Sequence, residues 1–214
     1  REIQNVKIPS YVKHISSYCF SHCLNLESIE FEENSQIETI GKGCFYKTKI
    51  EHISIPSNLK ELNDGWCEKT PKLVSFSISP KNKNFKNVDN KMIFGKSKEN
   101  DECFDTLLFA CRDIKHIKVP SCIKYISPYC FSDCKNIESI VFEENSELIS
   151  LGNNSFSNSS IEHISIPQSV EKIGKSSFFC CENLKTIEFN KNSRIVSIED
   201  KTFMKSSLQK ISIP

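Results

Sequence analysis

The sequence predicts a repeat solenoid, in which short parallel strands stack one per coil. Two observations lead to this fold class. The phrase FEENS occurs at Phe31–Ser35 and again at Phe142–Ser146, 111 residues later, and longer phrases recur with the same offset. Inside this duplication, apolar residues recur at steps that alternate between 23 and 24 residues, which gives the 47-residue spacing from Ile8 to Ile55. Chance does not produce such a period, so the repeat is the basis of the fold.

The strands come from a six-residue phrase that ends each unit, with apolar residues at its first, fourth and sixth positions. Its last four residues alternate, with β-branched or aromatic residues at the inward positions, as in a half-buried strand. Strands spaced by a whole coil cannot form hairpins with one another. They must lie parallel and form the sheet on the concave side of a curved solenoid. The phrases are 3–8, 26–31, 50–55, 73–78, 114–119, 137–142, 161–166, 184–189 and 208–213.

The rest of each unit returns the chain to the next strand. It carries the phrase Ile-x-x-x-x-Phe, as in Ile15 and Phe20, with Ser, Gly and Lys between, which predicts a short helical or irregular return. The repeated Phe would fill the layer between coils and so accounts for the 15 Phe residues. Stacked coils would then share one continuous core. Proline ends the strand because it has no N–H for the ladder, at Pro9, Pro56, Pro120, Pro167 and Pro214.

One interval breaks the period, because 41 residues separate Ile78 from Val119. We therefore divide the single repeat domain, 1–214, into a first repeat block at 1–78, an insert at 79–118 and a second repeat block at 119–214. The insert has apolar clusters around Phe85, at 92–94 and at 107–109, separated by a polar stretch at 95–105. This pattern predicts a β-hairpin-like replacement of one repeat with a long mobile tip. We expect the whole to be a fragment of a longer chain.

The repeat phrase resembles a known family. Ile8–Ile29, Val119–Ile140 and Ile166–Ile187 carry I-P-x-x-[VIL]-x-x-I-x-x-x-x-F-x-x-C-x-x-[LI]-x-x-I, which resembles the BspA-like leucine-rich repeats. In Ile55–Phe76, Cys67 stands where the pattern has Phe and Thr70 where it has Cys. The resemblance covers essentially the whole chain, and the insert is similar to this family as well. It implies a right-handed leucine-rich-repeat coil on a surface or secreted protein of bacteria or parasitic protozoa, which adheres to host cells or matrix or joins microbes.

Charge and motifs narrow the function. The chain has 28 basic and 27 acidic residues, so its overall charge favours neither nucleic acid nor an anionic membrane as a partner. No run of 18 apolar residues occurs, so a membrane would be reached only through an anchor outside this fragment. The motifs C-x-x-C, HExxH, GxSxG and a Gly-rich phosphate loop do not occur. We expect a non-enzymatic protein-binding module without cofactor or metal.

Two surfaces are candidates for binding a partner. One is the outward face of the concave sheet, which is polar and mixed in charge. The other is the charged tip of the insert, with Lys96 and Lys98, which we expect to line one edge of the concave groove. The alternatives are a merely solvated sheet and a tolerated insertion. The candidate residues on the sheet are Ser28, Glu30, His52, Ser54, Ser75, Ser77, His116, Lys118, Ser139, His163 and Ser165.

Histidines and cysteines invite other chemistry. His52, His116 and His163 share one column, but alternate strands hold them ~10 Å apart at ~4.8 Å per strand, whereas metal–nitrogen bonds are ~2 Å long. We therefore expect no metal there; a pH-sensitive binding face is the alternative. Most of the 11 cysteines fall in register, which indicates small core filler. Cys103 and Cys111 flank an apolar run and could pair under oxidising conditions.

The function we expect is that of a cell-surface adhesin or recognition protein, which engages host or matrix proteins through the concave face and the insert. A structural stalk within a surface protein is the first alternative. An intracellular protein-binding scaffold or inhibitor is the second, and an excess of free, buried cysteine would favour it.

Overall fold

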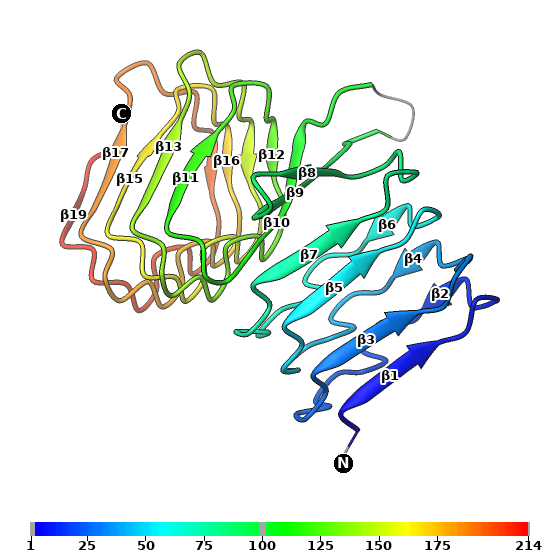
Figure 1. The fold of residues 1–214 in the computed structure, drawn as a ribbon. Coiled ribbons are helices and arrows are strands. Elements are labelled where there is room, and N and C mark those ends of the chain that lie inside the picture. Colours follow the sequence, from blue (N-terminus) through cyan, green and yellow to red (C-terminus); the bar gives the residue numbers. More distant parts are fainter. Residues whose placement is uncertain (1–2, 99–101, 214) are drawn as a thin grey trace.

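A computed structural model describes residues 3–98 and 102–213. The chain coils as predicted, and each coil contributes one strand of up to four residues to one side of the solenoid (Figure 1). We call these the long strands. All nine predicted strands are present. They are β1 (Asn5–Ile8), β3 (Ser28–Phe31), β5 (His52–Ile55), β7 (Ser75–Ile78), β11 (His116–Val119), β13 (Ser139–Phe142), β15 (His163–Ile166), β17 (Thr186–Phe189) and β19 (Lys210–Ile211).

The long strands pair in parallel, but not as one uninterrupted ladder. β1 pairs with β3, β5 with β7 and β11 with β13, while β17 pairs with β15 on one side and with β19 on the other. The four-residue pairings join residues 23 apart, such as Ile8 with Phe31 and Ile55 with Ile78. At the 24-residue steps from β3 to β5 and from β13 to β15, the strands belong to separate sheets. The 47-residue pair thus forms a two-stranded sheet of its own at β1–β3, β5–β7 and β11–β13, whereas β17 also pairs with β19 across a 24-residue step.

The returns contain no helix in the described residues, and they are more regular than the sequence predicted. Each regular return holds one two-residue strand between turns, and these short strands form a second set of parallel ladders. The Ile of the Ile-x-x-x-x-Phe phrase lies in the short strand and is buried, as Ile15 and Ile40 show. The short strands are β2 (His14–Ile15), β4 (Thr39–Ile40), β6 (Glu61–Leu62), β12 (Tyr125–Ile126), β14 (Ser150–Leu151), β16 (Lys172–Ile173) and β18 (Ser197–Ile198).

The aromatic rings of successive returns stack in a column inside the solenoid, as predicted from the repeated Phe. Neighbouring rings lie with their centroids 4.9 Å apart at Phe131–Phe156 and 5.8 Å apart at Phe20–Phe45. In the first block, Trp66 continues the column next to Phe45. The sequence pattern assigned this place to Cys67, which is also buried, but the neighbouring indole supplies the ring.

The insert is a three-stranded antiparallel sheet rather than a simple hairpin. β9 (Met92–Gly95) pairs on one side with β8 (Lys86–Val88) and on the other with β10 (Thr106–Ala110). β10 also pairs in parallel with β12, so the insert extends the short-strand sheet of the second block. In Figure 1 the insert lies between the two blocks, whose long strands run at an angle to each other.

The insert divides the core in two, where the sequence predicted one continuous core. β9 is buried on both faces, and its side chains alternate between the blocks: Ile93 packs in the first core, Met92 and Phe94 in the second. In β10, Phe109 packs in the first core and Leu107 in the second. In β9 this division follows from the two-residue alternation of a strand, whereas in β10 it coincides with a register shift between Leu107 and Phe109. The two strands thus form a wall shared by both cores.

A buried arginine also joins the blocks at this wall. The guanidinium of Arg112 donates from Nη1 to the carbonyl of Cys130, 3.1 Å away in the second block, and from Nη2 to that of Cys67, 3.4 Å away in the first. Its centre lies 5.0 Å from the ring centroid of Phe109. Backbone carbonyls and a ring face thus replace water around the buried cation. No repeat position predicts this residue.

Candidate functional site

The outward side chains of the long strands form the most regular exposed surface in the described part of the chain; we call it the long-strand face. In β5 the strand alternates, with His52 and Ser54 exposed and Ile53 and Ile55 buried. The structure places all eleven sheet candidates on these strands. Eight are exposed, and Ser28, Ser75 and Ser139 are half-buried. Because β7 and β11 lie on either side of the insert, the face is divided into two parts.

Each histidine on this face is hydrogen-bonded to the hydroxyl group opposite it. The Nδ1 atoms of His52 and His116 lie 3.0 Å from the Oγ atoms of Ser75 and Ser139. His163 pairs in the same way with Thr186, at 2.6 Å. The three rings therefore belong to separate cross-strand pairs. No group of three or more His, Cys, Asp or Glu side chains in the described ranges is arranged to hold a metal ion.

Side chains of the neighbouring outward column also bind polar groups of the next coil, within the column or just past the end of the next strand. The amine of Lys118 lies 2.9 Å from Glu143, and this hydrogen bond lowers the pKa of Glu143 below its usual value. Ser165 donates to Glu188 at 2.9 Å. Most of the candidate residues therefore already have a polar partner within the chain. Glu30 is exposed between these pairs.

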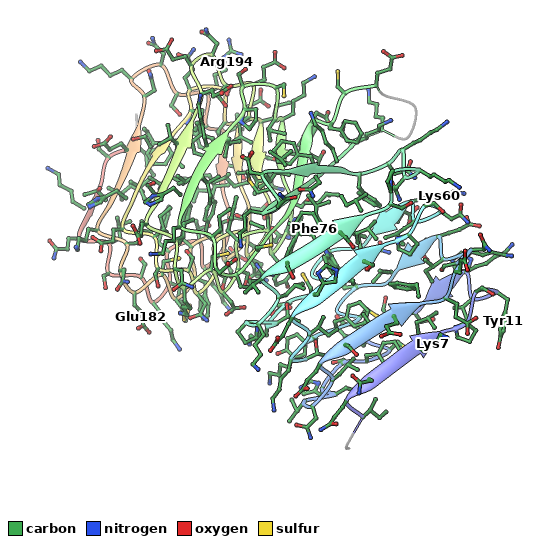
Figure 2. The ribbon with its side chains drawn as sticks, viewed as in Figure 1. Lys7, Tyr11, Lys60, Phe76, Glu182 and Arg194 are labelled. Carbon is green, nitrogen blue, oxygen red and sulfur yellow. The ribbon has the colours of Figure 1, made fainter. Side chains whose placement is uncertain are left out.

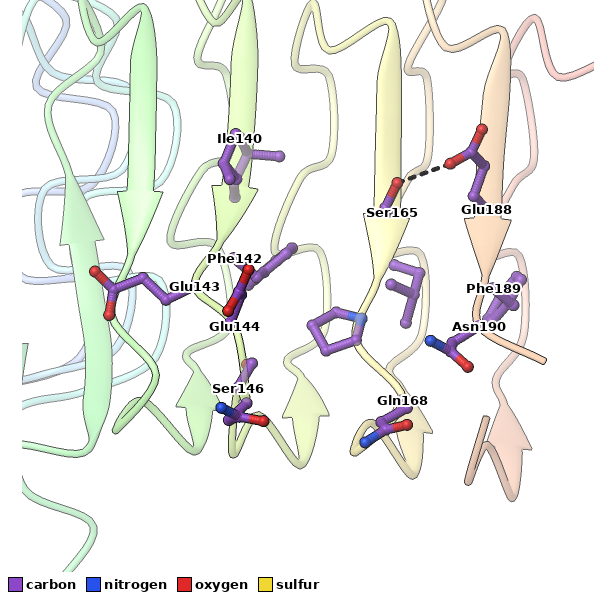
Figure 3. A pocket seen from close by; sticks show the side chains of 14 residues that line it. Ile140, Phe142, Glu143, Glu144, Ser146, Ser165, Gln168, Glu188, Phe189 and Asn190 are labelled. Carbon is purple, nitrogen blue, oxygen red and sulfur yellow. Dashed lines mark hydrogen bonds between the residues drawn. The ribbon is translucent and has the colours of Figure 1, made fainter. Parts of the chain in front are cut away.

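A recess opens where β13, β15 and β17 end, and we call it the second-block recess (Figure 3). Its volume is about 670 Å³. Phe142, Ile166 and Phe189 supply apolar surface, while Glu144 and Glu188 bring carboxylates to it. It lies beside the step where β13 and β15 are not paired. No sequence pattern predicted this recess, although the repeated FEENS phrase, at 142–146, lies in its lining.

The duplication places a counterpart in the first block, with a volume of about 600 Å³. Phe31 and Ile55 take the places of Phe142 and Ile166, but Ser77 stands where the second block has Glu188. The geometry is thus repeated, whereas the charge is not. The second-block recess is the more acidic of the two.

The insert belongs to the short-strand sheet rather than to the long-strand face. The base of its loop is ordered, because Ser97 donates from its backbone N and its Oγ to Asp105, at 2.8 and 2.6 Å. The amine of Lys96 lies 5.2 Å from the ring centroid of Phe104, and Lys98 is exposed. Residues 99–101 of the predicted mobile tip lie outside the described residues. The structure does not bring Lys96 and Lys98 into one sheet with the other candidates.

All 11 cysteines are free thiols in the structure. The structure does not pair Cys103 with Cys111: Cys103 is exposed, whereas Cys111 is buried in the first core. Core filling is confirmed for the in-register residues Cys44, Cys130, Cys134 and Cys181, and Cys67 and Cys111, which fall outside the register, are buried as well. It is wrong for Cys19, which is exposed on the outermost coil.

Comparisons with known proteins agree with this architecture. The family model of the BspA-type leucine-rich-repeat region matches in 6 copies, over residues 1–98 and 101–214. Among curated proteins, none matches the chain. In the described residues no helix is long and apolar enough to cross a bilayer.

Several solved structures share the fold. The pneumococcal vaccine antigen PcpA is 19% identical with a TM-score of 0.74, over 89% of this chain and 52% of its own. A leucine-rich cell-surface protein from Faecalibacterium prausnitzii has the same identity and TM-score, over 95% of this chain and 57% of its own. A leucine-rich-repeat protein from Eubacterium ventriosum is 22% identical with a TM-score of 0.69, over 87% and 54%. The chain thus spans little more than half the length of these proteins.

Proposed function

Because the chain belongs to the BspA-type leucine-rich-repeat family, we propose that it is a non-enzymatic recognition module of a cell-surface or secreted protein. Its partner would be a protein of a host cell or of the extracellular matrix. The long-strand face would be the main contact surface, and the insert, with Lys96 and Lys98, would add to it. Two of the solved structures with this fold are of a vaccine antigen and a cell-surface protein, which supports the proposed location.

The observation that carries this proposal is the cross-strand pairing of the exposed side chains. Immobilising a free polar side chain on binding costs about 0.5–1.5 kcal/mol. On the long-strand face, pairs such as His52–Ser75 and Ser165–Glu188 are already ordered. A partner that lies across the strands would therefore bind a prearranged surface and pay less of this entropy.

The second-block recess would supply the anchoring point that the flat face lacks. The predicted face residues include no Trp, Tyr or Arg, the residue types that usually dominate binding energy. A concave site with apolar walls and a few polar groups is the usual alternative. Val141, whose exposed fraction is 56%, lies beside the recess and extends its apolar surface.

Binding of the purified chain to host-cell monolayers and to coats of matrix proteins tests the proposed function. We expect saturable binding that is lost after the target is treated with a protease, because the partner is a protein. Binding that survives this treatment would contradict the proposal. An absence of binding to both targets would favour a structural stalk, in which another region of the full protein makes the contact.

A further inference from the structure

A third recess, with a volume of about 500 Å³, lies on the first block and shares Ser57 and Lys81 with the first-block counterpart of the second-block recess. We call it the basic recess. Four lysines line it, Lys13, Lys60, Lys81 and Lys83, together with a single carboxylate, that of Glu38. Figure 2 shows Lys60 at the edge of the first block. In a chain with a net charge of +1, this is a local concentration of positive charge.

The charged residues come from four successive coils: Lys13, Glu38 and Lys60 from the first three, and Lys81 and Lys83 from the fourth. The backbone N of Glu38 donates to the carbonyl of Lys13 at 2.7 Å, and that of Lys60 donates to the carbonyl of Glu38 at 2.8 Å. Asn84, from the start of the insert, then donates from its side chain to the carbonyl of Leu59 at 3.1 Å. The recess therefore crosses four coils. Three steps of ~4.8 Å separate the first coil from the fourth, so the recess is roughly 14 Å long. This shape fits a linear ligand better than a small compact one.

Most of the positive charge is uncompensated. The carboxylate of Glu38 lies 2.8 Å from the amine of Lys60, and this hydrogen bond lowers the pKa of Glu38. Among residues 3–98 and 102–213, no carboxylate forms an ion pair with Lys13, Lys81 or Lys83. Three ammonium groups are thus available to an anionic ligand.

The duplication shows that the fold does not require this charge. The second block has the same backbone hydrogen bonds, from Ile149 to Lys124 at 2.8 Å and from Glu171 to Ile149 at 2.9 Å. Two of the four lysine positions have lost their positive charge in the second block: Glu171 stands in place of Lys60, and Asn192 in place of Lys81. The two blocks therefore offer one basic and one balanced version of the same frame.

The polar lining identifies the ligand class. Every residue that lines the recess is polar and none is aromatic. A protein partner would be expected to bury apolar anchors, and single-stranded nucleic acid to stack on aromatic rings. Amides suit a hydroxyl-bearing chain. The Nδ2 atoms of Asn58 and Asn84 are held by backbone carbonyls, which leaves their Oδ1 atoms to accept hydrogen bonds from sugar hydroxyls. We infer that the basic recess binds an acidic polysaccharide.

Binding of heparin oligosaccharides, which carry sulfate and uronate, tests this inference by calorimetry at moderate salt. We expect saturable binding that weakens as salt rises, because ion pairs with lysine release counterions. The variant Lys60→Glu with Lys81→Asn, which installs the residues of the second block, should bind roughly tenfold more weakly or worse. Hyaluronate, which carries uronate alone, distinguishes the two anionic groups: binding of both polymers points to uronate, binding of heparin alone to sulfate.

Arg194→Glu is the matched control, because Arg194 occupies in the second block the place of Lys83. It should leave the affinity for heparin unchanged. Equal loss in the control and in the first-block variant would contradict the assignment of the site, as would no loss in either. Displacement of heparin by a DNA oligonucleotide at equal charge concentration would show a generic polyanion surface and overturn the saccharide assignment. None of these outcomes depends on the protein-binding proposal.

Discussion

The cysteine thiols of this chain differ widely in burial and in pKa, although the repeat places most of them in register. Burial raises the pKa of the thiols of Cys44 and Cys111 to about 12 and that of Cys67 to about 11, because the thiolate would lose its solvation. Cys19, Cys103 and Cys122 are exposed. Reactivity should therefore follow burial rather than sequence register, since the thiolate is the nucleophile.

Alkylation of the reduced, native chain at pH 8 tests this contrast by mass spectrometry. We expect rapid modification of Cys19, Cys103 and Cys122, while the six buried cysteines stay unmodified until the chain is denatured. Rapid alkylation of Cys44 or Cys67 in the native chain would show that the core is not packed as described.

Alkaline pH should destabilise the fold through the same thiols. A raised pKa means that the folded state keeps protons that the unfolded state releases. The contribution of neutral thiols to stability is then complete below the ordinary pKa of 9.0 and is lost between about pH 9 and 12. Each such thiol adds a slope on the order of 1.4 kcal/mol per pH unit in this window.

Urea unfolding between pH 8 and 11 measures this slope. The variant Cys44→Ala with Cys111→Ala is the comparison, because lysines and tyrosines also lose protons there. A parallel pH dependence in the variant and the parent would exclude the thiols as the cause.

The repeat pattern did not predict side chains whose role differs from that of the repeat position they occupy. Counting along the period places Cys67 in the aromatic column, but it cannot show that the neighbouring Trp66 turns its indole into that column. Arg112 was missed for a related reason. Its partners are the carbonyls of Cys67 and Cys130, which belong to different blocks and are far from Arg112 in the sequence. The binding candidates on the sheet were placed correctly because strand alternation alone decides which side chains face outward.

The insert is the element on which the packing of both blocks depends. Its strands β9 and β10 contribute side chains to two cores, and Phe109 contacts Trp66 and Phe76 of the first block, with ring centroids 5.4 and 6.3 Å apart. The sequence revealed the apolar clusters of the insert but not this role. A strand buried on both faces has no polar alternation to read, so the pattern alone did not separate the two cores.

Phe109→Ala should therefore cost about 3–5 kcal/mol of unfolding free energy, because it leaves a cavity that the paired sheets cannot close. Thermal or urea unfolding checks this. Val196→Ala, at a side chain whose exposed fraction is 84%, is the control and should stay within about 0.5 kcal/mol of the parent. A cost at Phe109 as small as at Val196 would contradict the shared wall.

The short strands and the recesses escaped prediction for a different reason. A two-residue strand such as β14 is defined by its neighbours β12 and β16 rather than by its own residues. The second-block recess likewise lies where the ends of β13, β15 and β17, from three successive coils, come together. Both features depend on the relation between coils, whereas the long strands follow from the pattern within one coil.

At the scale of the whole molecule, the chain is two repeat blocks joined by a wall, and it presents different chemistry on different surfaces. The long-strand face is polar and internally hydrogen-bonded, the second-block recess is apolar with acidic groups, and the basic recess lies on the edge of the first block. A solenoid can vary these surfaces independently, because each coil contacts only its neighbours. The internal duplication supplies a natural control for each of them.

The central proposal is that a protein partner binds the long-strand face. The double variant Ser54→Lys with Ser165→Lys adds a long charged side chain at equivalent, exposed positions of the two blocks and should leave the fold intact. Glu61→Lys makes a comparable change on the exposed side of a short strand and serves as the control.

The decisive measurement is the binding of these variants and the parent to the same protease-sensitive target on host cells or matrix coats. We predict that the double variant binds at least about tenfold more weakly, a loss of about 1.4 kcal/mol, while the Glu61 variant binds as the parent does. Unchanged binding by the double variant, or an equal loss in the Glu61 variant, would contradict the account.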